Sequence, residues 1–203
     1  SIYDVGKDGD TNFIVMEYVE GDTLTRYVEK QPQKLSLSHA MELMDQIAVA
    51  LNTLHESKVI HRDVKPENIM IRSHNQQAVL LDFGAAKEQN NMTLSNSSAV
   101  VSPGFAPPEQ YNATSLDGRI DQYSFAATLY FTLTGKRPPD VMFRMASGTQ
   151  LPSIRGDNPG VSGAVEAVIF KAMSLKPGAR YGSMEELWNA LVNAWKRSSK
   201  NGQ

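Results

Sequence analysis

The sequence predicts an α+β fold that is mainly α-helical and carries a few short antiparallel strands. Apolar residues recur with a helical period over long segments, Gly and Pro stop signals follow those segments, and the strand-like runs are short and bounded by polar turns. Hydrophobic residues make up 41% and charged residues 21% of the 203 residues, close to the average for globular domains. We therefore expect the chain to fold around a substantial core.

The predicted strands form two antiparallel pairs. Residues 2–5 and 13–16 are apolar and β-branched, and the polar stretch between them contains glycine, which predicts a hairpin. Residues 64–72 and 78–81 lie on either side of a polar turn. They predict a second pair of short strands.

The first long helix begins at Leu37. Apolar residues at 37, 41, 44, 48, 51 and 54 lie on one helical face that runs to about Glu56, and Ser36 is suited to cap its N-terminus. A second helix over residues 117–134 is apolar on most faces and ends at Gly135. We expect this second helix to form the centre of the core.

Two more amphipathic helices are predicted near the C-terminus, over residues 161–174 and 183–196. The first ends before a Lys-Pro-Gly stop signal. In the second, Ser183 and Glu186 match the capping-box pattern.

Composition excludes several classes of function. Twenty Lys and Arg residues against 22 Asp and Glu residues give a net charge of −2, which provides no bulk field for nucleic acid or an anionic membrane. The absence of cysteine excludes disulfides, thiolate catalysis and Cys-ligated zinc. The most apolar stretch, residues 123–133, is about half the length of a membrane span, so we expect no membrane segment in this chain.

The chemistry is concentrated in two motifs. Residues 61–68 read His-Arg-Asp-Val-Lys-Pro-Glu-Asn, and the tripeptide at residues 82–84 reads Asp-Phe-Gly directly after a strand-like run. Together they resemble the catalytic and metal-binding loops of eukaryotic-type, or Hanks-type, Ser/Thr protein kinases. The Pro-Pro-Glu-Gln sequence at residues 107–110 resembles the bacterial members of that family.

This resemblance implies ATP and Mg²⁺ as cofactors and assigns the catalytic roles. Asp63 would accept or orient the proton of the attacking hydroxyl, and Lys65 would neutralise charge on the transferred phosphoryl group. Asn68 and Asp82 would supply hard oxygen ligands to Mg²⁺.

The resemblance also implies an adenine site. Residues 16–21 look like the hinge, with Met16 as gatekeeper, the Glu17 carbonyl accepting from the adenine amino group and the Val19 amide donating to the ring. Met70 falls where the family places a side chain beneath adenine.

A phosphate pocket and a set of structural residues follow from the same resemblance. Arg62 and Lys87 would bind a phosphorylated activation loop, whose candidate phosphorylation sites are Thr93, Ser95, Ser97 and Ser98. The structural residues are an ion pair between Glu109 and Arg180, and Asp121, which would hold the backbone of the catalytic loop.

The resemblance divides the chain into a remnant of the small lobe with the hinge, residues 1–20, and the large lobe, residues 21–203. The Gly-rich loop and the strand lysine that hold the ATP phosphates in this family have no match in the sequence. We therefore expect the large lobe to need a partner N-lobe in the intact protein, to be inactive alone, and to self-associate weakly through the Phe13 hairpin.

The implied function is ATP- and Mg²⁺-dependent transfer of a phosphoryl group to a Ser or Thr hydroxyl of a protein substrate. The expected location is the cytoplasm, either free or as the cytoplasmic part of a membrane-anchored kinase. Two alternatives stay open: a pseudokinase or protein-interaction scaffold, and a small-molecule kinase related to the aminoglycoside phosphotransferases. Retention of Asp63, Lys65, Asn68 and Asp82 counts against a scaffold, and Lys65 also counts against a small-molecule kinase.

Overall fold

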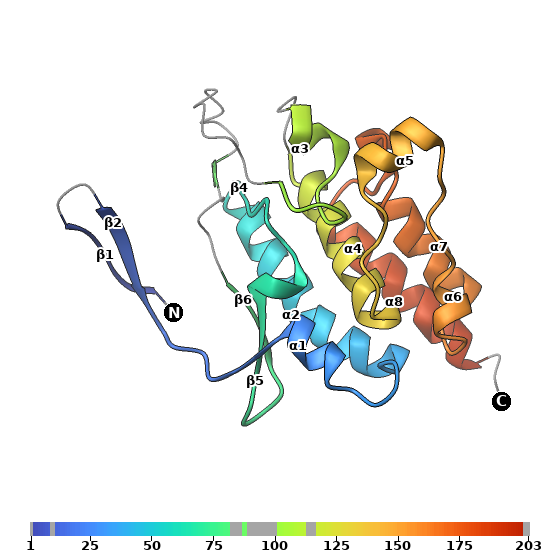
Figure 1. Ribbon diagram of the computed structural model, residues 1–203, viewed down its shortest axis with the longest axis horizontal. Coiled ribbons are helices and arrows are strands. Elements are labelled where there is room, and N and C mark those ends of the chain that lie inside the picture. Colours follow the sequence, from blue (N-terminus) through green and yellow to red (C-terminus); the bar gives the residue numbers. More distant parts are fainter. Residues whose placement is uncertain (1, 9–10, 82–86, 89–100, 113–116, 201–203) are drawn as a thin grey trace.

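The structure is a computed structural model that describes residues 2–8, 11–81, 87–88, 101–112 and 117–200. Helices occupy one side of the molecule and the strands lie at the other, with the first hairpin extending away from the helical body (Figure 1). The helices are α1 (Leu24–Glu29), α2 (Leu37–Glu56), α3 (Pro108–Asn112), α4 (Arg119–Thr134), α5 (Val141–Ser147), α6 (Ile154–Asp157), α7 (Gly163–Ala172) and α8 (Met184–Lys200). Two 3₁₀ turns, η1 (Pro66–Asn68) and η2 (Pro177–Ala179), lie between them.

Helix α4 forms the centre of the core, as the sequence predicts. Every residue from Ile120 to Thr134 is buried, although several are polar. The hydroxyls of Ser124, Thr128 and Thr132 donate to the carbonyl oxygens four residues earlier, at distances of 2.8–3.2 Å. Buried polar groups are tolerated when they are hydrogen-bonded, so these side chains add volume to the core without an unpaired donor.

The predicted ends of α2 and α4 are explained by their caps. Ser36 accepts from the backbone amide of His39 and begins α2 at Leu37. Helix α4 ends at Gly135, whose φ of 67° lies in the left-handed region that glycine adopts without strain. It begins at Arg119 rather than at residue 117, because the Asp117 carboxylate accepts from the Arg119 amide and side chain.

The two C-terminal helices differ in extent from their predictions. Helix α7 is shorter than the predicted segment and begins after Ser162, which caps it. Helix α8 continues to Lys200. Its capping box is incomplete, since Ser183 accepts from the Glu186 amide but the Glu186 carboxylate accepts from Gly182 instead of Ser183.

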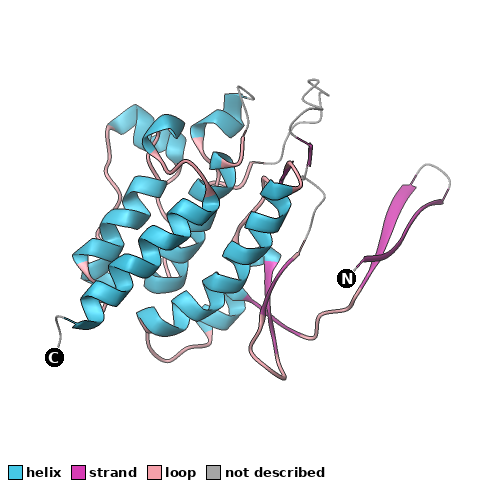
Figure 2. Ribbon diagram, turned by 180° about the vertical axis from the view of Figure 1, so that it is seen from behind, coloured by secondary structure: helices cyan, strands magenta, loops and turns pink. Residues whose placement is uncertain are grey.

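Within the described residues, seven short strands form three small antiparallel sheets. The strands are β1 (Ile2–Asp8), β2 (Thr11–Met16), β3 (Gly21–Thr23), β4 (Val59–Ile60), β5 (Ile69–Arg72), β6 (Ala78–Leu80) and β7 (Lys87–Glu88). Strand β1 pairs with β2, β4 pairs with β7, and the third sheet has the order β3-β5-β6. Figure 2 shows the β3-β5-β6 sheet beside the helices and the β1–β2 hairpin apart from them.

The second strand pair is present but shorter than predicted. Residues 64–68 are not a strand, because the amide of Asn68 donates to the Lys65 carbonyl and the chain forms the turn η1. Strand β5 therefore begins at Ile69. Lys65 and Asn68 therefore lie in a loop and its 3₁₀ turn instead of in a strand, and their side chains can converge on one point.

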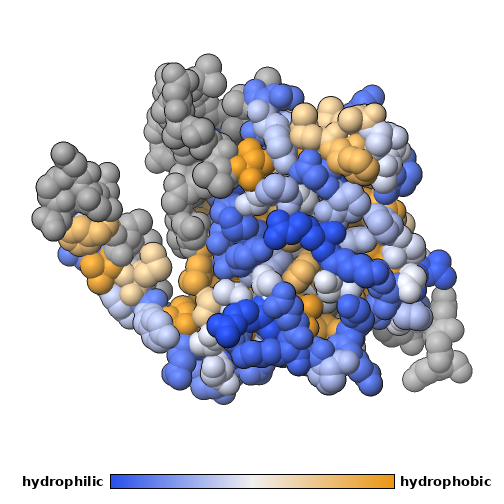
Figure 3. All heavy atoms as spheres, in the orientation of Figure 1, coloured by the Kyte–Doolittle hydropathy of each residue, from blue (hydrophilic) through white to orange (hydrophobic). Residues whose placement is uncertain are grey.

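The hairpin β1–β2 is confirmed, and it exposes apolar side chains, several of which are orange in Figure 3. Tyr3, Phe13, Val15 and Met16 are all among the large exposed hydrophobic residues. Among the described residues, no helix has the length and apolar character that a membrane span requires.

Candidate active site

The entry to the catalytic loop has an unusual backbone that Asp121 holds in place. Arg62 has a φ of 69°, a conformation that non-glycine residues adopt at a cost. The fully buried Asp121 carboxylate accepts from the backbone amides of His61, at 2.9 Å, and Arg62, at 2.8 Å. Nε2 of His55 lies 2.8 Å from the same carboxylate. The end of α2 and the start of α4 thus meet at this one side chain.

His61 connects the catalytic loop to the chain that leads into Asp82. Its Nε2 lies 3.2 Å from the Leu81 carbonyl oxygen, and the Leu81 amide donates to the Asn68 carbonyl at 2.8 Å. Asp82 itself lies outside the described residues. The backbone just before it is therefore attached to both ends of the catalytic loop.

Asp63 is the centre of a closed hydrogen-bond cluster. Its Oδ2 lies 2.7 Å from Nζ of Lys65 and accepts from Nδ2 of Asn68 at 2.8 Å. Its Oδ1 accepts from the Ser102 hydroxyl at 2.9 Å, and that hydroxyl accepts from Lys65 at 3.0 Å. The Asp63 side chain keeps 17% of its surface exposed, so an added hydroxyl group can reach it.

The amide orientation of Asn68 suits a metal ligand. Nδ2 donates to both the backbone carbonyl and the carboxylate of Asp63, at 2.8 Å each, and neither of these groups can donate in return. The amide therefore cannot flip, and its carbonyl oxygen Oδ1 faces away from Asp63. A hard, neutral oxygen of this kind is a ligand that Mg²⁺ accepts.

Arg62 has a cationic side chain that is half-buried. Its Nε is buried without a hydrogen-bond partner, and no ion pair of Arg62 is found within the described part of the chain. Burial lowers the pKa of the guanidinium, and the charge of Asp121 partly opposes this shift. The backbone of Lys87 lies nearby, since Lys87 pairs with Ile60 in the β4–β7 sheet. The four candidate phosphorylation sites, Thr93, Ser95, Ser97 and Ser98, lie outside the described residues.

The hinge residues occupy the segment between β2 and β3. Met16 ends β2 with an exposed side chain, and Val19 is buried. The Glu17 carboxylate accepts from Nη2 of Arg72 at 2.5 Å, and this hydrogen bond lowers the pKa of Glu17. Met70 lies in β5, the central strand of its sheet, where it is partly buried.

Glu109 and Arg180 form a buried bidentate ion pair. Nη1 and Nη2 of Arg180 donate to the two carboxylate oxygens at 2.5 and 3.0 Å, and both side chains are almost fully buried. Arg180 also donates to the carbonyls of Ser174, at 2.9 Å, and Arg119, at 2.8 Å. The pair joins α3 to the ends of α4 and α7.

Three further residues complete the site, and the sequence analysis did not predict them. Ser102 closes the Asp63 cluster, and Gln110 donates to the Arg62 carbonyl at 2.8 Å. Arg137 donates to the Glu67 carboxylate and to the Pro103 carbonyl, each at 3.1 Å. Gln110 ends the Pro-Pro-Glu-Gln sequence at residues 107–110 and Ser102 lies five residues before it, and this proximity to the motif was their sequence signal.

The segment after Ser102 makes a close turn that requires glycine. Gly104 has a φ of 83°, and a Cβ at this position would lie 2.7 Å from the Pro138 carbonyl oxygen. The Gly104 amide donates to the Asp140 carboxylate at 3.3 Å. The loop beside Asp63 is therefore held against the chain that follows α4.

Comparison with known proteins identifies the family. The protein kinase domain family model matches residues 1–184. A probable serine/threonine-protein kinase of Clostridium acetobutylicum is 36% identical over 200 residues, which are 95% of this chain and 30% of that protein. The serine/threonine-protein kinase PrkC of Bacillus subtilis is 34% identical over 193 residues, 92% of this chain and 30% of PrkC. The chain thus spans about 30% of the length of these curated relatives.

A solved structure gives the same result for the fold. The crystal structure of the PknI kinase domain of Mycobacterium tuberculosis superposes with a TM-score of 0.77 at 26% identity, covering 95% of this chain and 70% of that one. The α+β, mainly helical fold expected from the sequence is confirmed. The chain belongs to the protein kinase family, among relatives that are bacterial serine/threonine-protein kinases.

Proposed function

We propose that this protein transfers the γ-phosphoryl group of ATP to a Ser or Thr hydroxyl of a protein substrate. The observation that carries the proposal is the cluster around Asp63. Lys65, Asn68 and Ser102 all bond to its carboxylate, which stays partly exposed. Positioned charge and a positioned base are the main requirements of phosphoryl transfer. A scaffold would not need these four side chains to converge.

Each residue of the cluster has a distinct role in this proposal. Asp63 orients the substrate hydroxyl and accepts its proton, while Lys65 stabilises negative charge that builds on the transferred group. Ser102 bonds to both and limits their rotation. Asn68, through Oδ1, and Asp82 hold Mg²⁺, which supplies charge neutralisation on the ATP phosphates when bound.

We assign nucleotide recognition to the hinge. The backbone of Glu17 and Val19 binds the adenine edge, with Met16 beside the ring and Met70 beneath it. The ion pair between Glu17 and Arg72 supports this assignment, because it attaches the hinge to β5, the strand that carries Met70.

We assign regulation to phosphorylation between Thr93 and Ser98. The half-buried Arg62 guanidinium has an unpaired Nε, and the β4–β7 pairing brings the backbone of Lys87 near it. A phosphate group would supply the missing anion and order the loop. Mass spectrometry of the active protein should find phosphate in this segment, and an unmodified segment in active protein contradicts the assignment.

We further propose that residues 1–20 belong to the small lobe and hinge and that residues 21–203 form the large lobe. In support, β3 pairs with β5 of the helical body, whereas β1 and β2 pair with each other. The exposed face of Phe13 and Val15 fits contact with the remainder of an N-lobe, or weak self-association when that lobe is absent.

Because the reaction consumes ATP, we assign it to the cytoplasm.

The test is phosphotransfer to a protein substrate by this chain and by the protein with its natural upstream sequence. Asp63→Asn in the longer protein should reduce the rate by about 10²–10⁴ while ADP affinity changes little. Asp157→Asn, at a surface ion pair with Lys136, is the matched control and should leave the rate unchanged. Nucleotide binding without transfer by the longer protein would identify a pseudokinase and refute the enzyme proposal.

A further inference from the structure

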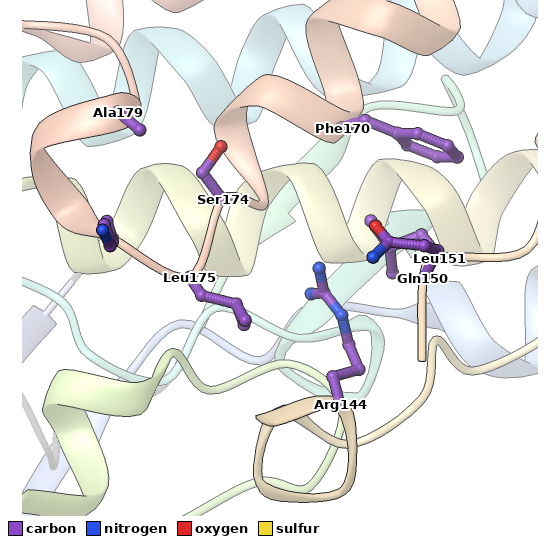
Figure 4. Close-up of a pocket in the computed structure, with 8 residues that line it drawn as sticks. Arg144, Gln150, Leu151, Phe170, Ser174, Leu175 and Ala179 are labelled. Atoms are coloured by element: carbon purple, nitrogen blue, oxygen red, sulfur yellow. The ribbon is translucent and has the colours of Figure 1, made fainter. Parts of the chain in front are cut away.

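A pocket of about 340 Å³ lies among α5, the segment after it, the end of α7 and the turn η2. It is separate from the Asp63 cluster, since none of the residues of that cluster line it. Figure 4 shows the Arg144 side chain pointing into the space between Gln150 and Leu175. Its volume is at the lower end of the range for small-ligand sites.

Arg144 is buried, and the described residues give it no negative partner. Its side chain is 7% exposed, and Nη1 donates to the Tyr123 hydroxyl at 3.1 Å and to the Met173 carbonyl at 3.3 Å. Nε is buried with no hydrogen-bond partner, and no carboxylate among the described residues forms an ion pair with Arg144. Buried charges in proteins are normally paired, so this guanidinium has an unfilled capacity for an anion.

The rest of the lining has both positive and apolar character. Lys176 adds a second cation, and none of the eight lining residues is acidic. Leu151, Phe170 and Leu175 provide an apolar wall. This combination suits a ligand with an anionic head group and an apolar body better than it suits a free inorganic ion.

We propose that this pocket binds a small amphipathic carboxylate. The carboxylate pairs with the positive charge of the Arg144 guanidinium, and the apolar body lies against Phe170 and Leu175. Arg144 also holds α5 to α4 and to the residue after α7 through its two neutral hydrogen bonds. The ligand supplies a negative partner to a side chain that already joins three parts of the fold.

The first experiment observes the Arg144 Nε–H directly. Two-dimensional ¹H–¹⁵N NMR of the protein is recorded during titration with octanoate, with octanol and inorganic phosphate as separate probes. Octanoate should move the Arg144 Nε–H resonance downfield and saturate, with a dissociation constant on the order of 1 mM for a ligand of this size. Octanol should not move this resonance, and phosphate should bind at least about tenfold more weakly because it lacks the apolar body.

Two variants separate binding from folding. Gln150→Glu places a carboxylate at the exposed rim, so it should raise the melting temperature and weaken octanoate binding by at least about tenfold. Gln33→Glu adds the same charge at another exposed site and should change neither property. Ala179→Phe fills the pocket from an exposed lining position and should abolish binding while the protein stays folded.

Three results would overturn the proposal: no saturable shift of the Arg144 resonance with octanoate, octanoate affinity that is unchanged in both pocket variants, or phosphate affinity equal to that of octanoate. The last result would mean a general anion site. Because every readout is binding or melting, failure here is distinguishable from failure of the proposed kinase activity.

Discussion

Substitution of Asp121 by Asn tests whether this one carboxylate holds the catalytic loop. The fully buried carboxylate accepts from the amides of His61 and Arg62 and bonds to His55. Asn is nearly the same size but offers a single acceptor oxygen. Its NH₂ group would face at least one backbone N–H, leaving that donor buried and unpaired.

The expected loss in the free energy of unfolding follows from these contacts. A hydrogen bond to a charged group contributes about 1.5–3 kcal/mol, and leaving a buried donor unpaired adds a penalty of about 1–3 kcal/mol. The left-handed backbone at Arg62 costs roughly 1–3 kcal/mol and persists only while its surroundings hold it. We expect Asp121→Asn to lower the free energy of unfolding by about 3 kcal/mol or more, out of the roughly 5–15 kcal/mol of a typical domain.

Urea unfolding measures this loss, with tryptophan fluorescence as the signal, since Trp188 on α8 packs edge-on against Phe125 of α4. Asp117→Asn is the matched control, because Asp117 also lies near the N-terminus of α4 but is 38% exposed in a surface pair with Arg119. Asp117→Asn should lower the free energy of unfolding by no more than about 1 kcal/mol. The reasoning is refuted if Asp121→Asn costs as little as the control.

Two further predictions concern the buried ion pair of Glu109 and the hydrogen-bonded carboxylate of Asp140. Glu109→Gln leaves the Arg180 guanidinium buried without its carboxylate and should cost about 3–5 kcal/mol by thermal unfolding, whereas a loss under about 1 kcal/mol would contradict a buried pair. Burial raises the pKa of Asp140, but hydrogen bonds from the Tyr111 hydroxyl and backbone amides outweigh it and lower the pKa below 3.8. Because the folded-state pKa is depressed, the stabilisation is present above about pH 4 and is lost as the pH falls through the folded value. Asp140→Asn should therefore flatten the acid limb of a pH–stability curve, and an unchanged slope would argue against this account.

The parts of the fold that the sequence predicts well are those with local causes. Helix α2 has its cap at Ser36 and an unbroken apolar face, and α4 has its stop at Gly135, so both follow from residues that are neighbours in the chain. Helices α1 and α5 were not predicted. Each has fewer than two full turns, which is too short for a helical period to stand out, and packing rather than periodicity maintains them.

The residues of the candidate site also fall into two groups, those that a local motif predicts and those that it does not. The motif at residues 61–68 indicated Asp63, Lys65 and Asn68, because the chemistry of these residues is visible in a short stretch of chain. Gln110 was not predicted, since its contact with the Arg62 carbonyl joins residues 48 positions apart. The buried, unpaired state of Arg144 could not be predicted either, because a surface arginine looks identical in sequence.

The sequence by itself determined the family, the chemical identity of the candidate catalytic residues, both ends of α2 and the C-terminal end of α4, since each depends on residue types at short spacing. The tertiary structure alone decided which side chains meet. It brought Ser102 to Asp63, placed Asp121 beneath a left-handed Arg62, and buried Arg144 beside a pocket. These features depend on how α4 and its neighbours pack, and packing is set by contacts between residues far apart in the chain.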